Sequence, residues 1–175
     1  MIRTSFGHLV PTLLVVSALT TWALTGAGCA RNPVSGRPEM VLVSAQQERE
    51  IGAEEAKRVE ELMGLVTDAK PGAYVQEIGR RLAEHSPRQD VEYRFFVVDA
   101  PEPNAFALPG GYIYVSRGLL ALVNAEDELA GTIGHEIGHV AARHHVQRLT
   151  LATPFAILLG LPAAIVGTIS KTLGD

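Results

Sequence analysis

The chain has 175 residues, which corresponds to one domain at most, and 47% of them are hydrophobic, enough to bury a core. Its 15 basic and 19 acidic residues give a formal net charge of −4, and no basic patch argues for nucleic acid as a partner. Cys29 is the only cysteine, which excludes an intramolecular disulfide.

The first 28 residues have the pattern of a secretory signal peptide. Arg3 is followed by an apolar run over residues 9–24 and by small residues up to Cys29. A cysteine after small residues is typical of the lipobox of bacterial lipoproteins, in which the thiol is acylated and becomes the new N-terminus. We therefore predict lipidation at Cys29, although Gly26 stands where a branched aliphatic residue is preferred. Ordinary signal cleavage is the alternative.

Residues 29–43 are punctuated by proline and glycine and are interpreted as a tether that leads to a short extended piece. Ser44 and Gln47 have the spacing of a capping box, which predicts a helix over residues 44–63 closed by Gly64. A second helix is expected to begin near Pro71 and to end before residue 87.

The middle of the chain predicts strands. Residues 91–99 alternate and are rich in aromatic and β-branched side chains, which indicates a strand. Residues 104–108 and 112–115 flank Pro-Gly-Gly, which predicts a hairpin. A short helix is expected over residues 117–122. The expected fold class is therefore α+β, a helical domain packed by a small sheet or hairpin.

The last predicted helix begins at Asn124, runs to about Arg148 and contains His135, Glu136 and His139 as a His-Glu-x-x-His motif. Two histidines four residues apart lie about 40° apart around a helix and about 6 Å along it, so both can reach one metal ion. This is the spacing of a catalytic zinc site, which keeps one position open for water. Glu136 lies beside the ligands, where it can act as a general base and take a proton from the water. The chemistry implied is amide hydrolysis; the alternative is two histidines that merely share a polar helix face.

Two further patterns concern the same helix. The glycines at 131, 134 and 138 share one flank, which suggests close approach of a neighbouring backbone. On a continuous helix His144 and His145 lie about 180° and 280° from His135, both off the metal-binding face. We therefore interpret them as packing or capping residues and not as ligands.

From residue 104 to residue 147 the sequence resembles the zinc metallopeptidases of the HtpX and CAAX-prenyl-protease type, in particular their bacterial lipoprotein branch. The resemblance is carried by Asn-Ala-Phe-Ala-Leu-Pro-Gly-Gly-Tyr-Ile-Tyr-Val, Glu-Leu-Ala-Gly before the motif, and Ala-Ala-Arg-His-His after it. Asn-Pro-Val-Ser-Gly-Arg at 32–37 and Val-Leu-Val-Ser at 41–44 also resemble the start of such lipoproteins.

The resemblance implies one Zn²⁺ per chain, with His135 and His139 as ligands and Glu136 as catalytic base. It implies that the hairpin borders the active-site cleft and holds an extended or unfolded polypeptide, with Asn104, Phe106 and Ala107 as substrate-binding residues. It also implies a lipid-anchored protein of the outer membrane, facing the periplasm, that cleaves periplasmic or outer-membrane proteins as part of quality control.

The resemblance further implies a third zinc ligand, a glutamate from a helix well downstream of the motif. After His139 the only acidic residue is Asp175, and Glu128 lies on the ligand face but about 10 Å along the axis from His135. We therefore interpret residues 44–175 as the N-terminal part of a metallopeptidase domain. The alternative is a catalytically incomplete lipoprotein with a chaperone-like or scaffold role.

Residues 149–170 carry no formal charge and are long enough to cross a bilayer. Proline and glycine interrupt this segment, which favours packing within the protein or lying at a membrane surface. A small integral membrane protein is a third interpretation of the chain.

Overall fold

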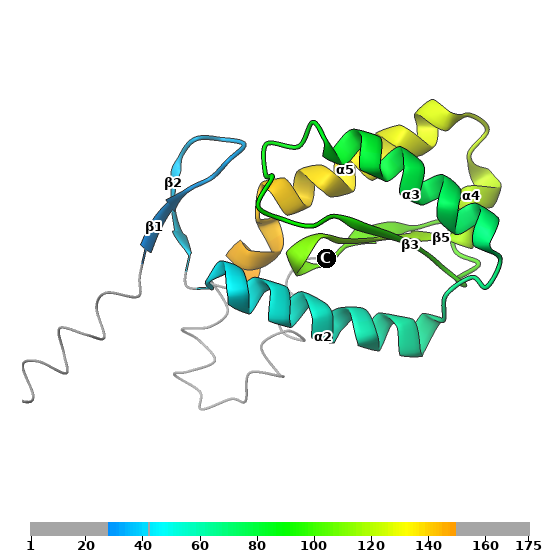
Figure 1. Cartoon of the computed structure of the whole chain (residues 1–175), viewed down its shortest axis with the longest axis horizontal. Coiled ribbons are helices and arrows are strands. Elements are labelled where there is room, and N and C mark those ends of the chain that lie inside the picture. The colour runs from blue at the N-terminus through cyan, green and yellow to red at the C-terminus, as the bar shows by residue number, and fades with distance from the viewer. Residues whose placement is uncertain (1–27, 42, 150–175) are drawn as a thin grey trace, which may run out of the picture.

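The structure is a computed structural model that describes residues 28–41 and 43–149 (Figure 1). Helices and a small sheet alternate along the chain, which confirms the α+β class. The named elements are β1 (Gly28–Arg31), β2 (Pro38–Val41), α2 (Ala45–Met63), α3 (Ala69–Ala83), β3 (Arg94–Val98), β4 (Ala105–Ala107), η1 (Pro109–Gly111), β5 (Tyr112–Ser116), α4 (Arg117–Leu122) and α5 (Glu126–Ala141).

The larger sheet has the strand order β3-β5-β4. The predicted hairpin is present, because β4 pairs with β5 in antiparallel register, with Phe106 opposite Tyr114. The parallel pairing of β3 with β5 was not predicted. It requires the chain to cross the end of β5 between β3 and β4, and Ser116 holds this crossing: its hydroxyl donates to the carbonyl of Glu102 at 2.7 Å and accepts from the N–H of Asn104 at 2.9 Å.

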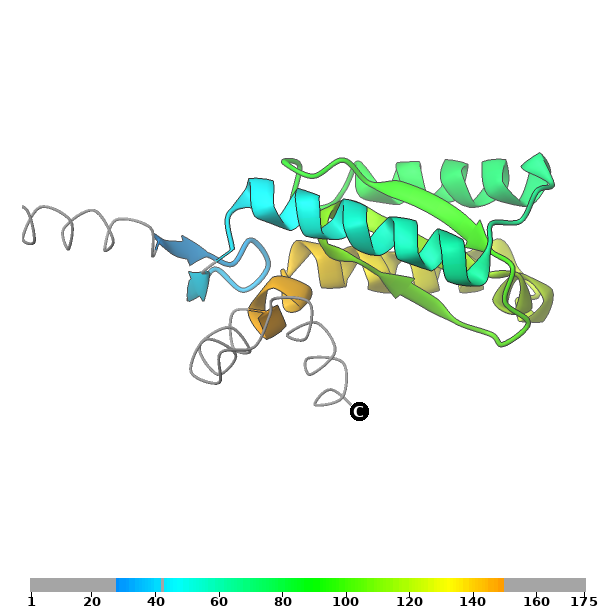
Figure 2. The same cartoon turned by 90° about the horizontal axis from the view of Figure 1, so that it is seen from below.

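The sheet lies between two layers of helices, with α2 on one face and α3 and α5 on the other (Figures 1 and 2). Because side chains alternate along a strand, β3, β4 and β5 each contribute side chains to both faces of the sheet. Toward α2, the rings of Phe96, Tyr114 and Phe106 stack in a row across the three strands, with centroids 5.2 Å apart at each step. Toward α3 and α5, the strands contribute side chains to the main core. This core consists of Val75, Ile78, Phe95, Val97, Ala107, Ile113, Val115, Leu129, Ile133, Ile137 and Val140.

The first two long helices begin and end close to their predicted positions. Ser44 and Gln47 form the expected capping box, and Gly64 ends α2. The second helix, α3, begins two residues before Pro71 because Asp68 accepts a hydrogen bond from the N–H of Lys70. Within α2, Gly52 lets the helix approach η1: a Cβ at this position would lie 1.9 Å from the carbonyl oxygen of Pro109. A glycine in α2 thus positions the turn between β4 and β5.

The segment predicted to be a tether, residues 29–43, differs from that prediction. Its strands β1 and β2 pair as an antiparallel hairpin, with Cys29 opposite Met40. Asn32 orders the connection, since its side-chain oxygen accepts from the N–H groups of Val34 and Ser35. Asn32 is only 5% exposed, and its amide donates to the carbonyl of Ala142 at 3.0 Å. Long-range contacts, which the local pattern does not encode, therefore fold this segment.

None of the helices among the described residues has the length and hydropathy needed to cross a membrane. The predicted signal peptide up to residue 27, and the apolar segment from residue 150 onward, lie outside the described residues.

Candidate metal centre

The helix α5 carries the two histidines of the His-Glu-x-x-His motif on the side turned away from its apolar stripe. Leu129 and Ile133 are fully buried and Ile137 and Val140 nearly so, all in the main core. Each buried side chain of this size contributes about 2 kcal/mol to stability, which fixes the rotation of the helix against the sheet. His135 is consequently exposed.

The start of α5 differs in detail from the prediction. Ala125, and not Asn124, is the N-cap residue, and it provides no side-chain cap. Instead the carboxylate of Glu128 accepts a hydrogen bond from the N–H of Asn124 at 2.8 Å. Three acidic residues in the first turn stabilise this end of the helix through its dipole.

His135 and His139 face each other with geometry that suits one shared metal ion. Their Nε2 atoms lie 3.0 Å apart and their rings are perpendicular. Two nitrogens that bind one tetrahedral zinc ion at about 2.05 Å lie about 3.3 Å apart, so a small rotation of either ring accommodates the ion. Among the residues that the structure describes, His135, Glu136 and His139 form the one group of three or more such side chains that could hold a metal, with ligand atoms within 4.8 Å of one another. The donor set fits zinc.

Glu136 lies between the metal-binding face of α5 and strand β4. It is 8% exposed, and this burial raises the pKa of its carboxyl group. The nearby His135 and a backbone hydrogen bond from Ala107 act in the opposite direction. A carboxylate that is partly desolvated and tied to an adjacent strand is suited to taking up and releasing a proton.

The expected substrate-binding residues lie on and beside β4, but they point in different directions. Asn104 is exposed and precedes the strand. Phe106 stacks on Tyr114 on the face of the sheet turned to α2, whereas Ala107 belongs to the core on the α5 side. The backbone of β4, and not the Phe106 ring, therefore lies next to Glu136.

The predicted close approach along the glycine flank of α5 is wrong for the described residues. A Cβ at Gly131, Gly134 or Gly138 would meet no described atom within 4 Å. The spacing of the glycines correctly placed them on one flank of the helix, but it did not show whether another segment packs there.

The helix predicted to run to about residue 148 is broken after Ala141. Arg143 adopts a left-handed conformation, with φ of 56°, before the chain becomes helical again over residues 144–149. Side chains from distant segments and from the following helical turn bind the carbonyls at this break. Arg88 donates to the carbonyl of Val140 at 3.2 Å, and Asn32 and Gln147 donate to that of Ala142 at 3.0 and 2.9 Å. The break is thus held by tertiary contacts.

The break changes the position of His144, which was expected to lie off the metal-binding face. Its Nδ1 lies 2.7 Å from Nδ1 of His139. The ring of His145 lies farther away, with its centroid 6.5 Å from that of His139. Burial, followed by the charge of Arg148, lowers the pKa of His145 to about 4, so this imidazole is neutral at pH 7. The predicted position of His144 was wrong because the angle from His135 was calculated for an unbroken helix.

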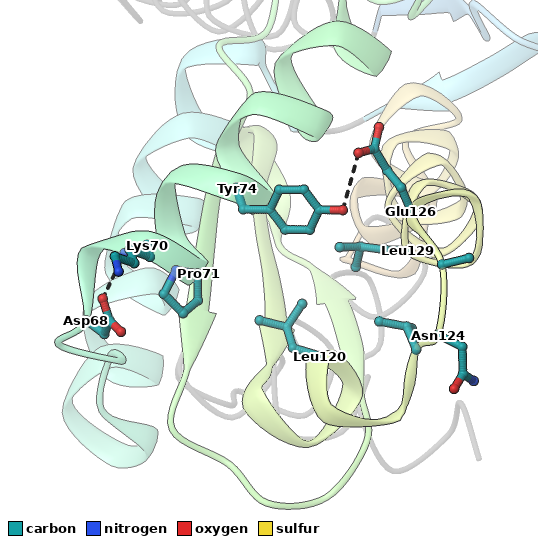
Figure 3. Close-up of a pocket in the computed structure, with 10 residues that line it drawn as sticks. Asp68, Lys70, Pro71, Tyr74, Leu120, Asn124, Glu126 and Leu129 are labelled. Atoms are coloured by element: carbon teal, nitrogen blue, oxygen red, sulfur yellow. Dashed lines mark hydrogen bonds between the residues drawn. The ribbon is translucent and has the colours of Figure 1, made fainter.

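A shallow pocket of about 500 Å³ lies at the other end of α5 (Figure 3). Its rim includes Tyr74, whose hydroxyl donates to Glu126 at 3.3 Å. None of the three motif residues contributes to it. Its lining is formed by Asp68, Lys70, Pro71, Tyr74, Leu120, Val123, Asn124, Ala125, Glu126 and Leu129.

Comparison with known proteins identifies the family. Residues 69–172, more than half of the chain, match peptidase family M48. The chain belongs to this family. It is 30% identical over 135 residues to the mitochondrial metalloendopeptidase OMA1 of Schizosaccharomyces pombe, covering 75% of this chain and 40% of that protein. It is 29% identical over 145 residues to the β-barrel assembly-enhancing protease of Escherichia coli, covering 82% of this chain and 30% of that protein.

The prediction of a metallopeptidase is confirmed at the level of the M48 family. The chain spans well under half of the length of both curated relatives.

The ion pair between Arg88 and Glu48 lies next to the helix break after Ala141, and its removal tests whether it stabilises this part of the fold. Arg88 binds both carboxylate oxygens of Glu48, at 2.7 and 2.6 Å, and both side chains are almost fully buried. Arg88→Met should lower the free energy of unfolding by about 3–5 kcal/mol, because it leaves the buried Glu48 carboxylate with only Arg143, at 3.8 Å, as a positively charged neighbour. Urea unfolding measures the loss.

Arg80→Met is the matched control, since Arg80 pairs with Glu77 and Glu84 on the exposed face of α3. Arg80→Met should lower the free energy of unfolding by only about 0–1 kcal/mol. Equal and small losses in the two variants would contradict a structural role for the buried pair.

Proposed function

We propose that this chain carries the metal-binding helix and substrate-binding strand of a zinc-dependent metalloendopeptidase of the HtpX-like lipoprotein branch. The observation that supports this most directly is the convergence of His135, His139 and Glu136 beside β4. His135 and His139 would hold one Zn²⁺ through their Nε2 atoms, leaving positions for water and for a further ligand. When bound, zinc would polarise the scissile carbonyl group and lower the pKa of water.

Glu136 acts as the proton carrier in this proposal. Its carboxylate takes a proton from the attacking water as the oxygen bonds to the carbonyl carbon of the peptide. The same carboxyl group then passes the proton to the departing amide nitrogen as the C–N bond breaks, so that one water is consumed for each bond cleaved. Burial favours the neutral form of Glu136 that the second transfer requires.

The substrate is proposed to bind in extended form along β4. Residues 104, 106 and 108 direct their backbone hydrogen-bonding groups to β5, as the bonds from Ser116 N–H to Asn104 and from Leu108 N–H to Tyr112 indicate. In an antiparallel pair the intervening residues direct theirs away from the partner strand. The backbone groups of Ala105 and Ala107 therefore point to the edge next to Glu136, where a peptide can add as a strand.

Asn104, Phe106 and Ala107 contribute to substrate binding in different ways under this proposal. Asn104 is exposed at the start of the edge, Ala107 shapes the backbone next to Glu136, and Phe106 holds the strand flat by stacking on Tyr114. Unfolded or extended polypeptides of the periplasm or outer membrane are the proposed substrates. The name of the Escherichia coli relative supports substrates connected with the assembly of β-barrel proteins.

The proposed location is the periplasmic side of the outer membrane, with a lipid on Cys29 as the membrane anchor and no nucleic acid as a partner. The small residues before Cys29 support this anchor. In the purified protein, intact-mass measurement should find Cys29 at the N-terminus with acyl chains attached, and Cys29→Ser should move the protein to the soluble fraction. A mature wild-type chain that is soluble and unacylated would contradict the anchor.

Glu136→Gln tests the catalytic proposal. It removes the proton carrier while retaining size and the neighbouring ligands, so casein cleavage should fall by about 10²–10⁴-fold. Zinc content, measured by atomic emission, should stay at one ion per chain. Chelation should abolish wild-type cleavage, and added Zn²⁺ should restore it. Cleavage that survives the substitution would show that the mechanism is wrong.

Ala105→Pro tests strand addition, because proline removes the N–H that points away from β5 without removing a bond between β4 and β5. Loss of one or two hydrogen bonds should raise the KM for an extended peptide by about three- to tenfold. Ala105→Ser keeps the N–H and should leave KM unchanged. An unchanged KM in the proline variant, with zinc content intact, would place the substrate elsewhere.

A further inference from the structure

The two ring nitrogens of His139 face different histidines. Its Nε2 lies 3.0 Å from Nε2 of His135, on the side proposed to hold the metal. Its Nδ1 lies 2.7 Å from Nδ1 of His144, with the two ring centroids 4.9 Å apart. A neutral imidazole carries one N–H donor and one acceptor nitrogen, so Nε2 of His139 is free to bind a metal when the proton of this ring is on Nδ1.

His144 is placed by the break after α5, not by the helix itself. On a continuous helix it would lie on the far side from His135. The left-handed conformation of Arg143 turns the chain back, and the bonds from Arg88 and Asn32 to the carbonyls of Val140 and Ala142 hold that turn. The buried network therefore fixes a contact at the metal-binding face.

We propose that His144 is a positioning residue for His139, an inference that rests on the proposed metal-binding function. The Nδ1–H of His139 donates to Nδ1 of His144. This leaves the lone pair of His139 Nε2 directed at the metal and fixes the orientation of its ring. A partner on the second nitrogen of a metal-binding histidine sets both tautomer and orientation, and its loss typically costs 10–100-fold in metal affinity.

The geometry separates this role from direct metal binding. The atom that His144 directs at His139 meets Nδ1, the nitrogen on the other side of the ring from the proposed ligand atom. His144 also lies outside the group of ligand atoms within 4.8 Å of one another, which consists of His135, Glu136 and His139. His144 is exposed, so it can be replaced without opening the core.

Two substitutions of His144 test the proposal in the full chain purified in detergent. His144→Leu removes the acceptor, whereas His144→Asn retains one in its amide oxygen. Competition with a chromophoric chelator measures the affinity for Zn²⁺. His144→Leu should weaken binding by about 10–100-fold, and His144→Asn should stay within about threefold of the wild type. His85→Asn, at an exposed histidine after α3, is the matched control and should bind zinc as the wild type does.

A second measurement reads the hydrogen bond itself. In the zinc-loaded wild type, long-range ¹H–¹⁵N correlation spectra should show the proton of His139 on Nδ1, and His144→Leu should shift or broaden this signal. Equal zinc affinity in the leucine and asparagine variants would overturn the positioning role while leaving the proposed function in place. Equal and complete loss of binding in both, with X-ray absorption showing three imidazoles in the wild type, would make His144 a direct ligand and also overturn it. A wild-type chain that binds no zinc would remove the proposed function and this inference together.

Discussion

The geometry of the candidate metal centre depends on the burial of one stripe of α5 against the sheet. Leu129, Ile133, Ile137 and Val140 pack against the sheet and α3, and they leave the helix only one rotation that keeps all four out of water. In that rotation the two motif histidines point outward together and Glu136 points toward β4. The hydrophobic effect thus orients the polar groups of the site, although none of the stripe residues takes part in its chemistry.

A second constraint acts at the end of the same helix. Where the helix stops, the carbonyl of Val140 keeps a backbone hydrogen bond from the N–H of Arg143 at 3.1 Å, and a buried carbonyl without any partner would cost about 1–3 kcal/mol. Side chains also bind the carbonyls at this helix end: Arg88, after α3, donates to Val140, and Asn32 of the β1–β2 hairpin and the nearby Gln147 donate to Ala142. The N-terminal hairpin is therefore part of the structure that supports the metal centre.

The two edges of the sheet have different surroundings, and this difference bears on the candidate site. Its β3 edge is engaged by the chain itself, since Leu65 forms a bridge to Val98 and the side chain of Gln76 accepts from the N–H of Phe95. The β4 edge lies next to Glu136. One edge is thus protected within the domain and the other borders the candidate site. This arrangement agrees with the proposed strand addition of an extended peptide at the β4 edge.

Local patterns in the sequence predicted much of this arrangement. The capping box at Ser44 and Gln47, the β4–β5 hairpin around Pro-Gly-Gly, and the helical spacing of His135 and His139 each depend on residues within a few positions of one another. Such features can be read from the sequence because their energies are set by short stretches of backbone. The resemblance to metallopeptidases over residues 104–147 is confirmed at the level of family M48.

Only the tertiary structure decided the features that join distant segments. These are the parallel pairing of β3 with β5, the hairpin formed by residues expected to be a tether, and the turn at Arg143 that brings His144 to His139. A left-handed arginine costs energy locally and persists only where its surroundings stabilise it. The buried Arg88–Glu48 pair and Asn32 supply that stabilisation from 52 to 110 positions away along the chain. The sequence by itself therefore determined which side chains are candidates to bind a metal ion and to transfer a proton. The packing of remote segments determined which way these side chains face.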